Sequence, residues 1–236
     1  MAIWAIVPAA GVGKRMGTEI PKQYLSICGK TVLQHTLERL GRVRALSGVV
    51  LVLHPDDETP FPAGILQSLP VRIARGGHER CHSVLNALKI LEPELASDDW
   101  VLVHDAARPC LRPSEVDRLI EAVGKHDVGG VLAAPVTDTL KRANNEGEVA
   151  GTVDRTALYR ALTPQLFRFH ILSRALQLAA DQNRIVTDDS AAIECLGLSP
   201  LIVPGSTDNI KITQESDLLL AEVIMQQQNS QGVEIP

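Results

Sequence analysis

The chain has 236 residues, and its 23 Lys and Arg against 28 Asp and Glu give a formal net charge of -5 with histidine neutral. This acidic excess argues against a general binder of nucleic acids or acidic membranes, because such partners are held by a surplus of cationic contacts to phosphates. Aromatic residues make up only 3% of the chain, too few for a row of stacking platforms for single-stranded bases. Any anionic ligand must therefore be bound by a local cluster of cations.

With 45% hydrophobic and 22% charged residues, the composition is that of a soluble globular protein, and the length suits one large α/β domain or two small ones. The four cysteines form no C-x-x-C pair, and the seven histidines follow no zinc-ligand spacing. We therefore expect reduced cysteines and a cytoplasmic location. No run of about eighteen apolar residues occurs, so a membrane span is not expected.

Short apolar, β-branched runs predict buried strands at residues 3–7, 49–53, 71–74, 100–103, 130–134 and 201–203. Between most of them, apolar residues at three- and four-residue spacing predict helices at residues 32–40, 80–91, 113–123, 168–180 and 190–196, and a last helix at about 214–228. Strands without polar alternation that alternate with helices indicate an α/β fold with a single doubly wound, mostly parallel sheet. We expect one domain over residues 1–236, with a frayed tail at 229–236.

Residues 136–163 break this alternation of strands and helices. Strand-like segments at 139–143 and 148–153 flank the sequence Asn144-Asn145-Glu146-Gly147, which is typical of a hairpin turn. A lone hairpin of polar strands is not stable in water, so it needs support from another part of the protein. We expect a projecting arm that packs on a second subunit to form a homodimer. A local flap over the functional site is the alternative.

The first strand leads into a loop of small residues followed by cations, Pro8-Ala9-Ala10-Gly11-Val12-Gly13-Lys14-Arg15-Met16-Gly17. Small residues let the backbone approach a ligand closely, and successive N–H groups can form a concave anion site. The loop is not a P-loop, because Pro8 and Arg15 stand where Gly and Ser or Thr are required, and Met16 breaks the dinucleotide fingerprint. With the cations Lys14, Arg15 and Lys22 close by, the pattern favours a nucleoside triphosphate over a plain strand-to-helix turn.

Further motifs follow along the chain: Pro8-Ala9-Ala10-Gly11-x-Gly13-x-Arg15-Met16, Pro21-Lys22-Gln23-Tyr24, Gly76-Gly77-x-x-Arg80-x-x-Ser83-Val84, His104-Asp105-Ala106-Ala107-Arg108-Pro109, Pro135-Val136-x-Asp138-Thr139, Thr152-Val153-Asp154-Arg155, Ala161-Leu162-Thr163-Pro164-Gln165, Thr187-Asp188-Asp189 and Asp208-Asn209-Ile210-Lys211. In this order, and over nearly the whole chain, they resemble the 2-C-methyl-D-erythritol 4-phosphate cytidylyltransferases of the non-mevalonate isoprenoid pathway. The resemblance implies a Rossmann-like nucleotidyltransferase that joins CTP and methylerythritol phosphate, with release of pyrophosphate. The chain departs from the family pattern at His78 and His82, where some relatives carry acidic residues.

The resemblance also implies a role for individual residues. The expected catalytic residues are Arg15, Lys22, Arg155 and Lys211. The expected CTP-binding residues are Pro8, Ala9, Ala10, Gly11, Gly13, Gly77, Ser83, Asp105 and Ala106. The expected contacts to the second substrate are Asp105, Arg108, Thr139, Arg155, Thr163 and Lys211. Arg155 and Thr163 are expected to reach the site from the partner subunit through the arm. Mg²⁺ or another divalent cation is the expected cofactor, with Asp105 as its expected ligand and Asp208 as a second candidate contact.

The implied nucleophile is a phosphate oxygen, which is largely ionised at neutral pH because the second pKa of a phosphomonoester is about 6. No general base is needed, so catalysis consists of aligning two anions and neutralising the charge that moves to pyrophosphate. Asp105 follows the strand at 100–103 and is expected at the carboxyl end of the sheet, where ligands bind, although it could instead cap the next turn. Two other functions stay open, a ribitol-5-phosphate cytidylyltransferase and a non-catalytic nucleotide-sensing module.

Overall fold

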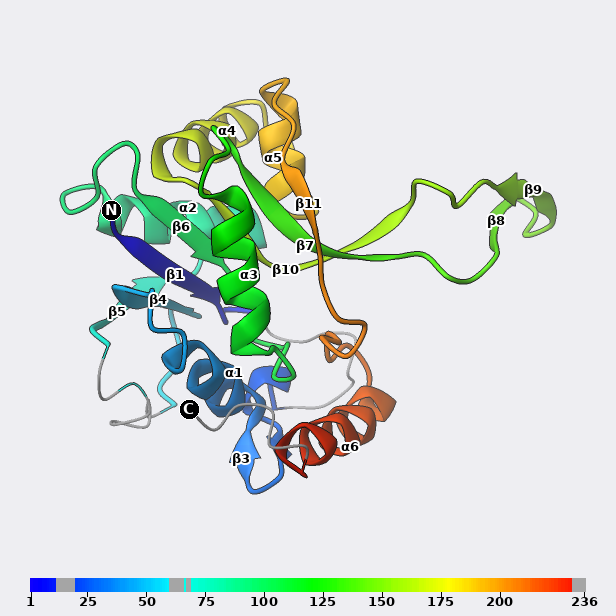
Figure 1. Cartoon of the computed structure of the whole chain (residues 1–236), viewed down its shortest axis with the longest axis horizontal. Coiled ribbons are helices and arrows are strands. Elements are labelled where there is room, and N and C mark those ends of the chain that lie inside the picture. Colours follow the sequence, from blue (N-terminus) through cyan, green and yellow to red (C-terminus); the bar gives the residue numbers. More distant parts are fainter. Residues whose placement is uncertain (12–19, 60–65, 67–68, 231–236) are drawn as a thin grey trace.

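A computed structural model describes residues 1–11, 20–59, 66 and 69–230 of the chain. Its centre is a seven-stranded sheet (Figure 1) with the spatial order β11 (Leu201–Pro204), β7 (Gly129–Pro135), β10 (Tyr159–Arg168), β6 (Trp100–Val103), β1 (Ile3–Pro8), β4 (Gly48–Leu53) and β5 (Val71–Arg75). β10 runs antiparallel to its two neighbours, and the other neighbouring strands pair in parallel. The predicted α/β fold with a mostly parallel sheet is therefore confirmed.

Helices cover both faces of this sheet (Figure 1). One face carries α2 (Arg80–Leu91), α4 (Phe169–Asp181) and α5 (Asp189–Cys195), and the other carries α1 (Val32–Gly41) and α3 (Pro113–Val123). Successive side chains of a strand point to opposite faces, so Val101 of β6 joins the first core and Leu102 joins the second. The sheet is thus buried on both sides, as the apolar runs in the sequence predicted.

The predicted elements agree with the observed ones to within one residue at most ends, and two differences stand out. α6 (Glu215–Ser230) extends two residues beyond its predicted end, so residues 229 and 230 are helical and do not belong to a frayed tail; residues 231–236 lie outside the described part of the chain. The second difference is β10, a ten-residue strand that the sequence did not predict. It joins β6 to β7 in the middle of the sheet, and its first residues had been assigned to the arm.

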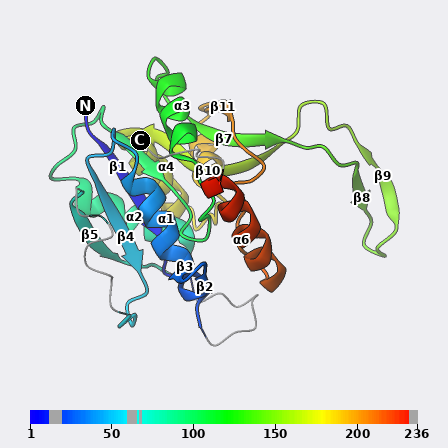
Figure 2. The same cartoon turned by 60° about the horizontal axis from the view of Figure 1, so that its bottom comes forward.

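The C-terminal helix α6 forms a third, smaller core with the hairpin of β2 (Ser26–Ile27) and β3 (Lys30–Thr31) and with the loop after β6. Figure 2 shows α6 beside this hairpin. The buried apolar residues of this third core are Ile27, Val32, Ala107, Cys110, Ile212, Ala221, Ile224 and Met225. The backbone N–H of Ile212 donates to the carbonyl of Ala107 at 2.9 Å. This core therefore holds the segment before α6 against the loop that follows β6.

A two-stranded hairpin of β8 (Leu140–Ala143) and β9 (Val149–Val153) projects from the body (Figures 1 and 2). We call residues 136–158 the arm. Its turn contains Gly147 with φ of +84°, a left-handed conformation that glycine adopts without strain. Residues 159–163 had been predicted in the arm, but they belong to β10, where Tyr159 pairs with Pro135. The hairpin was therefore predicted correctly, whereas the predicted arm was about five residues too long at its C-terminal end.

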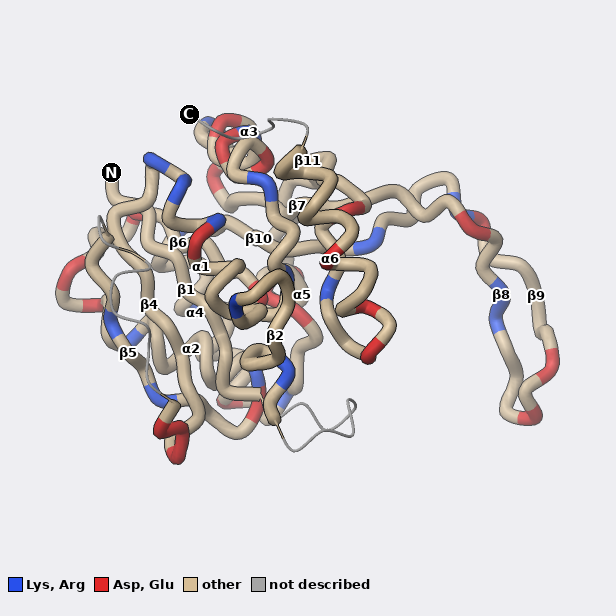
Figure 3. The backbone as a smooth tube through the Cα atoms, turned by 90° about the horizontal axis from the view of Figure 1, so that it is seen from below, with Lys and Arg blue, Asp and Glu red and all other residues tan. Residues whose placement is uncertain are grey.

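Charged residues of both signs are interspersed over the body and the arm (Figure 3). Cys28, Cys81, Cys110 and Cys195 are all free thiols, as expected. Among the helices that the structure describes, none is long and apolar enough to cross a membrane.

Candidate functional site

A cavity of about 570 Å³ opens at the carboxyl ends of β1 and β6. Ligands bind at this edge in open α/β sheets, beside the point where the strand order reverses. Its walls come from the end of β1, the short helix η2 (Lys22–Tyr24), the start of α2, the loop after β6 and the segments before α5 and α6. The lining residues are Pro8, Ala9, Ala10, Gly11, Lys22, Gln23, Gly77, His78, Glu79, Arg80, Ser83, Asp105, Ala106, Ala107, Ile185, Val186, Thr187, Lys211 and Thr213.

Most of the predicted CTP-binding residues meet in this cavity. The predicted residues in the lining are Pro8, Ala9, Ala10, Gly11, Lys22, Gly77, Ser83, Asp105, Ala106 and Lys211. Gly13 and Arg15 lie outside the described residues. Arg108 and Thr163 contact Asp105 from beneath the cavity, and Thr139 and Arg155 lie in the exposed arm. Asp208 does not line the cavity, because its carboxylate pairs with Arg112 at 2.8 Å; the structure therefore does not bring it to Asp105 as a second metal ligand.

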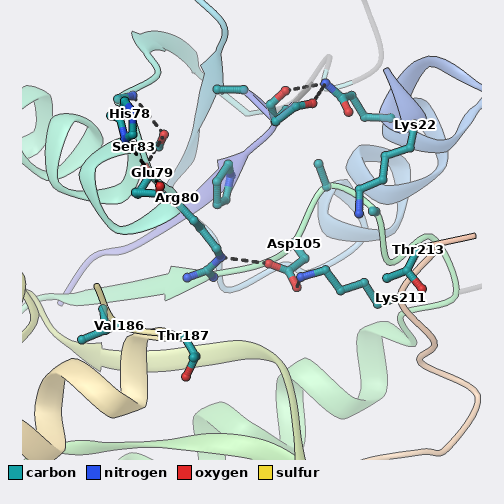
Figure 4. Close-up of a pocket in the computed structure, with 18 of the residues that line it drawn as sticks. Lys22, His78, Glu79, Arg80, Ser83, Asp105, Val186, Thr187, Lys211 and Thr213 are labelled. Carbon is teal, nitrogen blue, oxygen red and sulfur yellow. Dashed lines mark hydrogen bonds and ion pairs between the residues drawn. The ribbon is translucent and has the colours of Figure 1, made fainter. Parts of the chain in front are cut away.

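One wall is formed by the end of β1 and the helix η2. Gln23 is buried, and its side-chain amide donates to the carbonyls of Ala9 at 2.6 Å and Gly11 at 3.2 Å. These bonds fix η2 against the small-residue loop. The ammonium of Lys22 donates to the carbonyl of Ile212 at 2.9 Å, so its side chain spans the side of the cavity nearest α6 (Figure 4).

The opposite wall is the turn between β5 and α2. A Cβ atom on Gly77 would lie 2.4 Å from the Cβ of His82, so only glycine fits this close approach of the turn to the helix. The Gly77 N–H donates to the hydroxyl of Ser83 at 3.0 Å, and this hydroxyl donates to the carbonyl of Glu79 at 3.2 Å. His82 accepts the N–H of Glu79 in a capping box, whereas His78 is exposed at the rim. Ser83 thus orders the turn as well as lining the cavity.

At the base of the cavity, the carboxylate of Asp105 contacts three cations, of which Figure 4 shows Arg80 and Lys211. Its Oδ1 lies 3.1 Å from Nε of Arg80, and its Oδ2 lies 2.9 Å from Nζ of Lys211 and 3.4 Å from Nε of Arg108. Burial alone would raise the pKa of Asp105, but the charges of Arg80, Lys211 and Arg108 outweigh it and hold the pKa well below its ordinary value. Asp105 is therefore ionised and sets the position of Arg108 in its own loop and of Arg80 and Lys211 from two distant segments.

A buried hydrogen-bond chain supports Asp105 from below. The hydroxyl of Thr163 accepts the N–H of Asp105 at 3.0 Å and lies 3.0 Å from Nδ1 of His104, whose Nε2 lies 3.2 Å from the carbonyl of Arg108. Since a carbonyl can only accept, the ring proton of neutral His104 is assigned to Nε2, and Nδ1 accepts from Thr163. The expectation that Thr163 serves a partner's site is wrong, because its hydroxyl is already used beneath Asp105 of its own chain.

The buried hydrogen-bond network beneath Asp105 gives His104 an unusual pKa. Burial lowers its pKa to about 4 from an ordinary 6.5, although the charge of Asp105 opposes the shift. The folded protein keeps His104 neutral while the unfolded chain binds a proton below pH 6.5. This difference reduces the free energy of unfolding as pH falls from 6.5 towards 4.

NMR titration of the ring nitrogens, assigned with His104→Gln, should show one imidazole that keeps its Nε2–H form down to about pH 5. A His104 pKa at or above 6.5 would contradict this network.

The lining offers few protein ligands for the expected Mg²⁺. Over the residues that the structure describes, no group of three or more His, Cys, Asp or Glu side chains could hold a metal ion by itself. Mg²⁺ favours one or two carboxylates together with phosphate oxygens. The donor set therefore fits a metal that arrives with a triphosphate and contacts Asp105, and it does not fit a resident ion held by protein ligands alone.

Sequence reasoning missed several residues of the site. Arg80 and Asp189 stand in motifs that resemble the family, but the sequence analysis assigned neither of them a role in the site. Their spacing did not show that the two side chains meet across 109 positions. Gln23 was also in a motif, and its burial gave no signal in the sequence. Ile185 and Val186 line the cavity next to Thr187, and nothing in their residue types predicted it.

Comparisons with known proteins match nearly the whole chain. The model of a family described as 2-C-methyl-D-erythritol 4-phosphate cytidylyltransferase matches residues 3–227. The protein of that name from Hahella chejuensis is 49% identical over 224 residues, which cover 94% of this chain and 92% of that protein. The one from Vibrio parahaemolyticus is 51% identical over 219 residues, which cover 92% and 93%. The crystal structure of the Francisella tularensis cytidylyltransferase is 33% identical with a TM-score of 0.81, covering 95% of this chain and 100% of that one.

Proposed function

Because the chain belongs to the 2-C-methyl-D-erythritol 4-phosphate cytidylyltransferase family, we propose that the cavity at the ends of β1 and β6 is its active site. The enzyme transfers CMP from CTP to the phosphate of 2-C-methyl-D-erythritol 4-phosphate, giving 4-diphosphocytidyl-2-C-methyl-D-erythritol and pyrophosphate in isoprenoid precursor biosynthesis. The observation that carries this assignment is the convergence of Lys22, Lys211 and Asp105 beside the small-residue end of β1. The free cysteines suit a reducing compartment, and we place the enzyme in the cytoplasm.

The cytosine end of CTP belongs at the turn before α2. Cytosine presents an amino donor and carbonyl and ring-nitrogen acceptors, which backbone N–H and carbonyl groups can read without aromatic side chains. Backbone groups of Ala9, Ala10, Gly11 and Gly77 line this part of the cavity together with the Ser83 hydroxyl. The tight packing of Gly77 on His82 fixes these groups before the nucleotide arrives. A preformed polar edge of this kind discriminates between bases because an unmatched base would leave buried polar groups unpaired.

The triphosphate then extends towards Lys22 and Asp105. Lys22 and Arg15 are the cations assigned to the α-phosphate, where negative charge develops as the bond to pyrophosphate breaks. Asp105 is the carboxylate that would hold Mg²⁺ on the triphosphate. That ion, when bound, would neutralise phosphate charge and favour departure of the pyrophosphate. The Pro8 and Ala106 backbone borders the same space and keeps the nucleotide at the carboxyl edge of the sheet.

The second substrate approaches from the side of Lys211. Its phosphate oxygen attacks the α-phosphorus of CTP, a new P–O bond forms, and the bond between the α- and β-phosphates breaks with release of pyrophosphate. Lys211 and Arg155 are the cations assigned to this phosphate, with Arg108 and Thr139 as further contacts. Lys211 lies on the cavity wall beside Asp105, whereas Arg155 lies in the exposed arm, away from the cavity of its own chain. A partner's arm would bring the second cation, so we propose that the enzyme is a homodimer.

Removing the arm tests the dimer directly. The N–H of Val136 donates to the carbonyl of Leu158 at 3.0 Å, so an Asn-Gly turn can replace residues 137–157 and join the two strands. This variant should sediment as a monomer, bind CTP like the wild type and lose turnover, because it lacks Arg155. The control Arg155→Ala should stay dimeric and lose turnover. An arm-less chain that remains a dimer would assign the contact to another surface.

The assigned reaction is tested by pyrophosphate release with CTP, Mg²⁺ and each candidate acceptor. Release with methylerythritol phosphate, and none with ribitol 5-phosphate at the same concentration, is the expected result. Release with ribitol 5-phosphate alone would select the rival cytidylyltransferase. CTP binding without release from either acceptor would point to a nucleotide-sensing module instead.

A further inference from the structure

Arg80 is the arginine that the structure places in the lining of the cavity, among the residues it describes. It stands at the start of α2, three residues after Gly77, and its side chain crosses the cavity floor towards Asp105 (Figure 4). Its Nε lies 3.1 Å from Oδ1 of Asp105, and its Nη2 lies 2.8 Å from Oδ2 of Asp189. One guanidinium therefore joins the wall that carries the cytosine turn to the start of α5.

Asp189, which pairs with Arg80, lies where an ionised carboxylate lowers the stability of the fold. It is fully buried, and its Oδ1 has no hydrogen-bond partner within the described residues. Burial raises its pKa, and the charge of Arg80 opposes this shift. A buried carboxylate with one unsatisfied oxygen does not favour stability, so we look for its role in what it does to its partner. The partner that it contacts is Arg80.

The two ion pairs of the Arg80 guanidinium leave some of its N–H donors available to a ligand. A guanidinium carries five N–H donors, and the contacts to Asp105 and Asp189 use Nε and Nη2. In the described part of the chain, Nη1 makes no hydrogen bond. The side chain is 24% exposed, in contrast to the 10% of Arg108, which contacts Asp105 from outside the lining. Arg80 can therefore donate to a ligand without giving up either carboxylate.

We propose that Arg80 is a further CTP-binding residue and that Asp189 is the positioning residue that keeps its guanidinium in place. An entering triphosphate would compete with Asp105 for this cation. The second anchor at Asp189, on the other side of the guanidinium, prevents it from swinging away with the ligand. Binding then requires no rearrangement of the cavity floor, and this preorganisation favours affinity for CTP. The inference rests on the proposed CTP site.

Calorimetric titration of CTP in excess Mg²⁺ tests this role apart from turnover. Arg80→Gln should weaken CTP binding by about tenfold to a hundredfold, the range for one hydrogen bond to a charged group. The KM for methylerythritol phosphate should change less than about twofold, because Arg80 lies on the nucleotide side. The control Arg168→Gln removes an arginine that stacks on Trp100 at the opposite end of β6, and its CTP affinity should equal that of the wild type.

A double-mutant cycle tests the role of Asp189. Asp189→Asn should weaken CTP binding at least about fivefold in the wild-type background and less than twofold in the Arg80→Gln background, since it acts through Arg80. If Asp189→Asn does not fold, Arg80→Lys replaces it: a single ammonium cannot bridge both carboxylates as a planar fork does, so CTP binding should again weaken at least about fivefold. Folding is checked by thermal melting.

The outcomes separate this inference from the proposed site. A wild-type protein that does not bind CTP would overturn the site itself. A wild-type protein that binds CTP, together with an Arg80→Gln variant of equal affinity, would overturn only the role of Arg80. Equal effects of Asp189→Asn in both backgrounds, or an Arg80→Lys variant that binds CTP like the wild type, would remove Asp189 as the positioning residue.

Discussion

Replacing Lys22 with alanine should lower kcat about a hundredfold, the scale typical of losing one donor that acts in the transition state. Its ammonium lies in the cavity wall, 2.9 Å from the Ile212 carbonyl, and the side chain is only half-buried, so its loss opens no hole in the core. Loss of a cation that acts on charge developing between CTP and pyrophosphate lowers kcat more than it raises KM. Steady-state assays of pyrophosphate release at varied CTP separate these two effects.

The matched control is Lys30→Ala. Lys30 is an exposed lysine whose ammonium pairs with Glu38 at 2.6 Å, away from the cavity, so its removal should leave kcat unchanged. Arg15→Ala should reduce kcat on the same scale as Lys22→Ala; that expectation rests on the family motif, because Arg15 lies outside the described residues. A Lys22→Ala enzyme with kcat within about threefold of the wild type would remove Lys22 from the transition state.

The sheet could be predicted from the sequence because parallel strands buried on both faces leave uninterrupted apolar runs. β10 escaped prediction for an equally physical reason. It is a central strand that contains Pro164, which cannot donate to a ladder, and proline argues against a central strand on sequence grounds. The structure accommodates it with an irregularity, since the pairing of β10 with β7 shifts between Ala161 and Gln165. The same irregular stretch places Thr163 beneath Asp105.

The members of the site could be predicted largely from motifs, but their connections could not. Backbone positions such as Ala9 and Gly77 follow from small residues at the end of a strand. The pairing of Arg80 with Asp189 and the hydroxyl bridge from Thr163 depend on which side chains meet after folding. Arg155 lies in the exposed arm, away from the cavity of its own chain, and the target proposed for it lies in a second chain, which one sequence does not show. Side-chain networks between distant segments could thus be identified only in the folded structure.

Asp105→Asn should have the largest effect on this enzyme, because it removes the carboxylate that three cations share. Breaking a buried ion pair by removing one partner costs about 3–5 kcal/mol, since the remaining charges stay buried and repel one another. Arg80, Arg108 and Lys211 would lose their common anchor, and the site would lose the carboxylate assigned to the metal. We expect the free energy of unfolding to fall by this amount and kcat to fall about a thousandfold, the upper scale for one preorganised electrostatic group.

The pH dependence of stability distinguishes the contribution of the Asp105 charge from the contribution of its side-chain packing. The pKa of Asp105 is depressed in the folded state, so its ionised form stabilises the protein above its ordinary pKa of 3.8, and this contribution is lost as pH falls below that value. The stability gap between the wild type and Asp105→Asn should thus be constant near neutrality and shrink in acid, as measured by urea unfolding. Asp99→Asn, at the other end of β6, is the control: Asp99 accepts the N–H groups of Ala2 and Ala96, so its loss should lower stability but leave kcat unchanged. A gap that stays constant below pH 3.8 would show that the cations around Asp105 are held by something other than its charge.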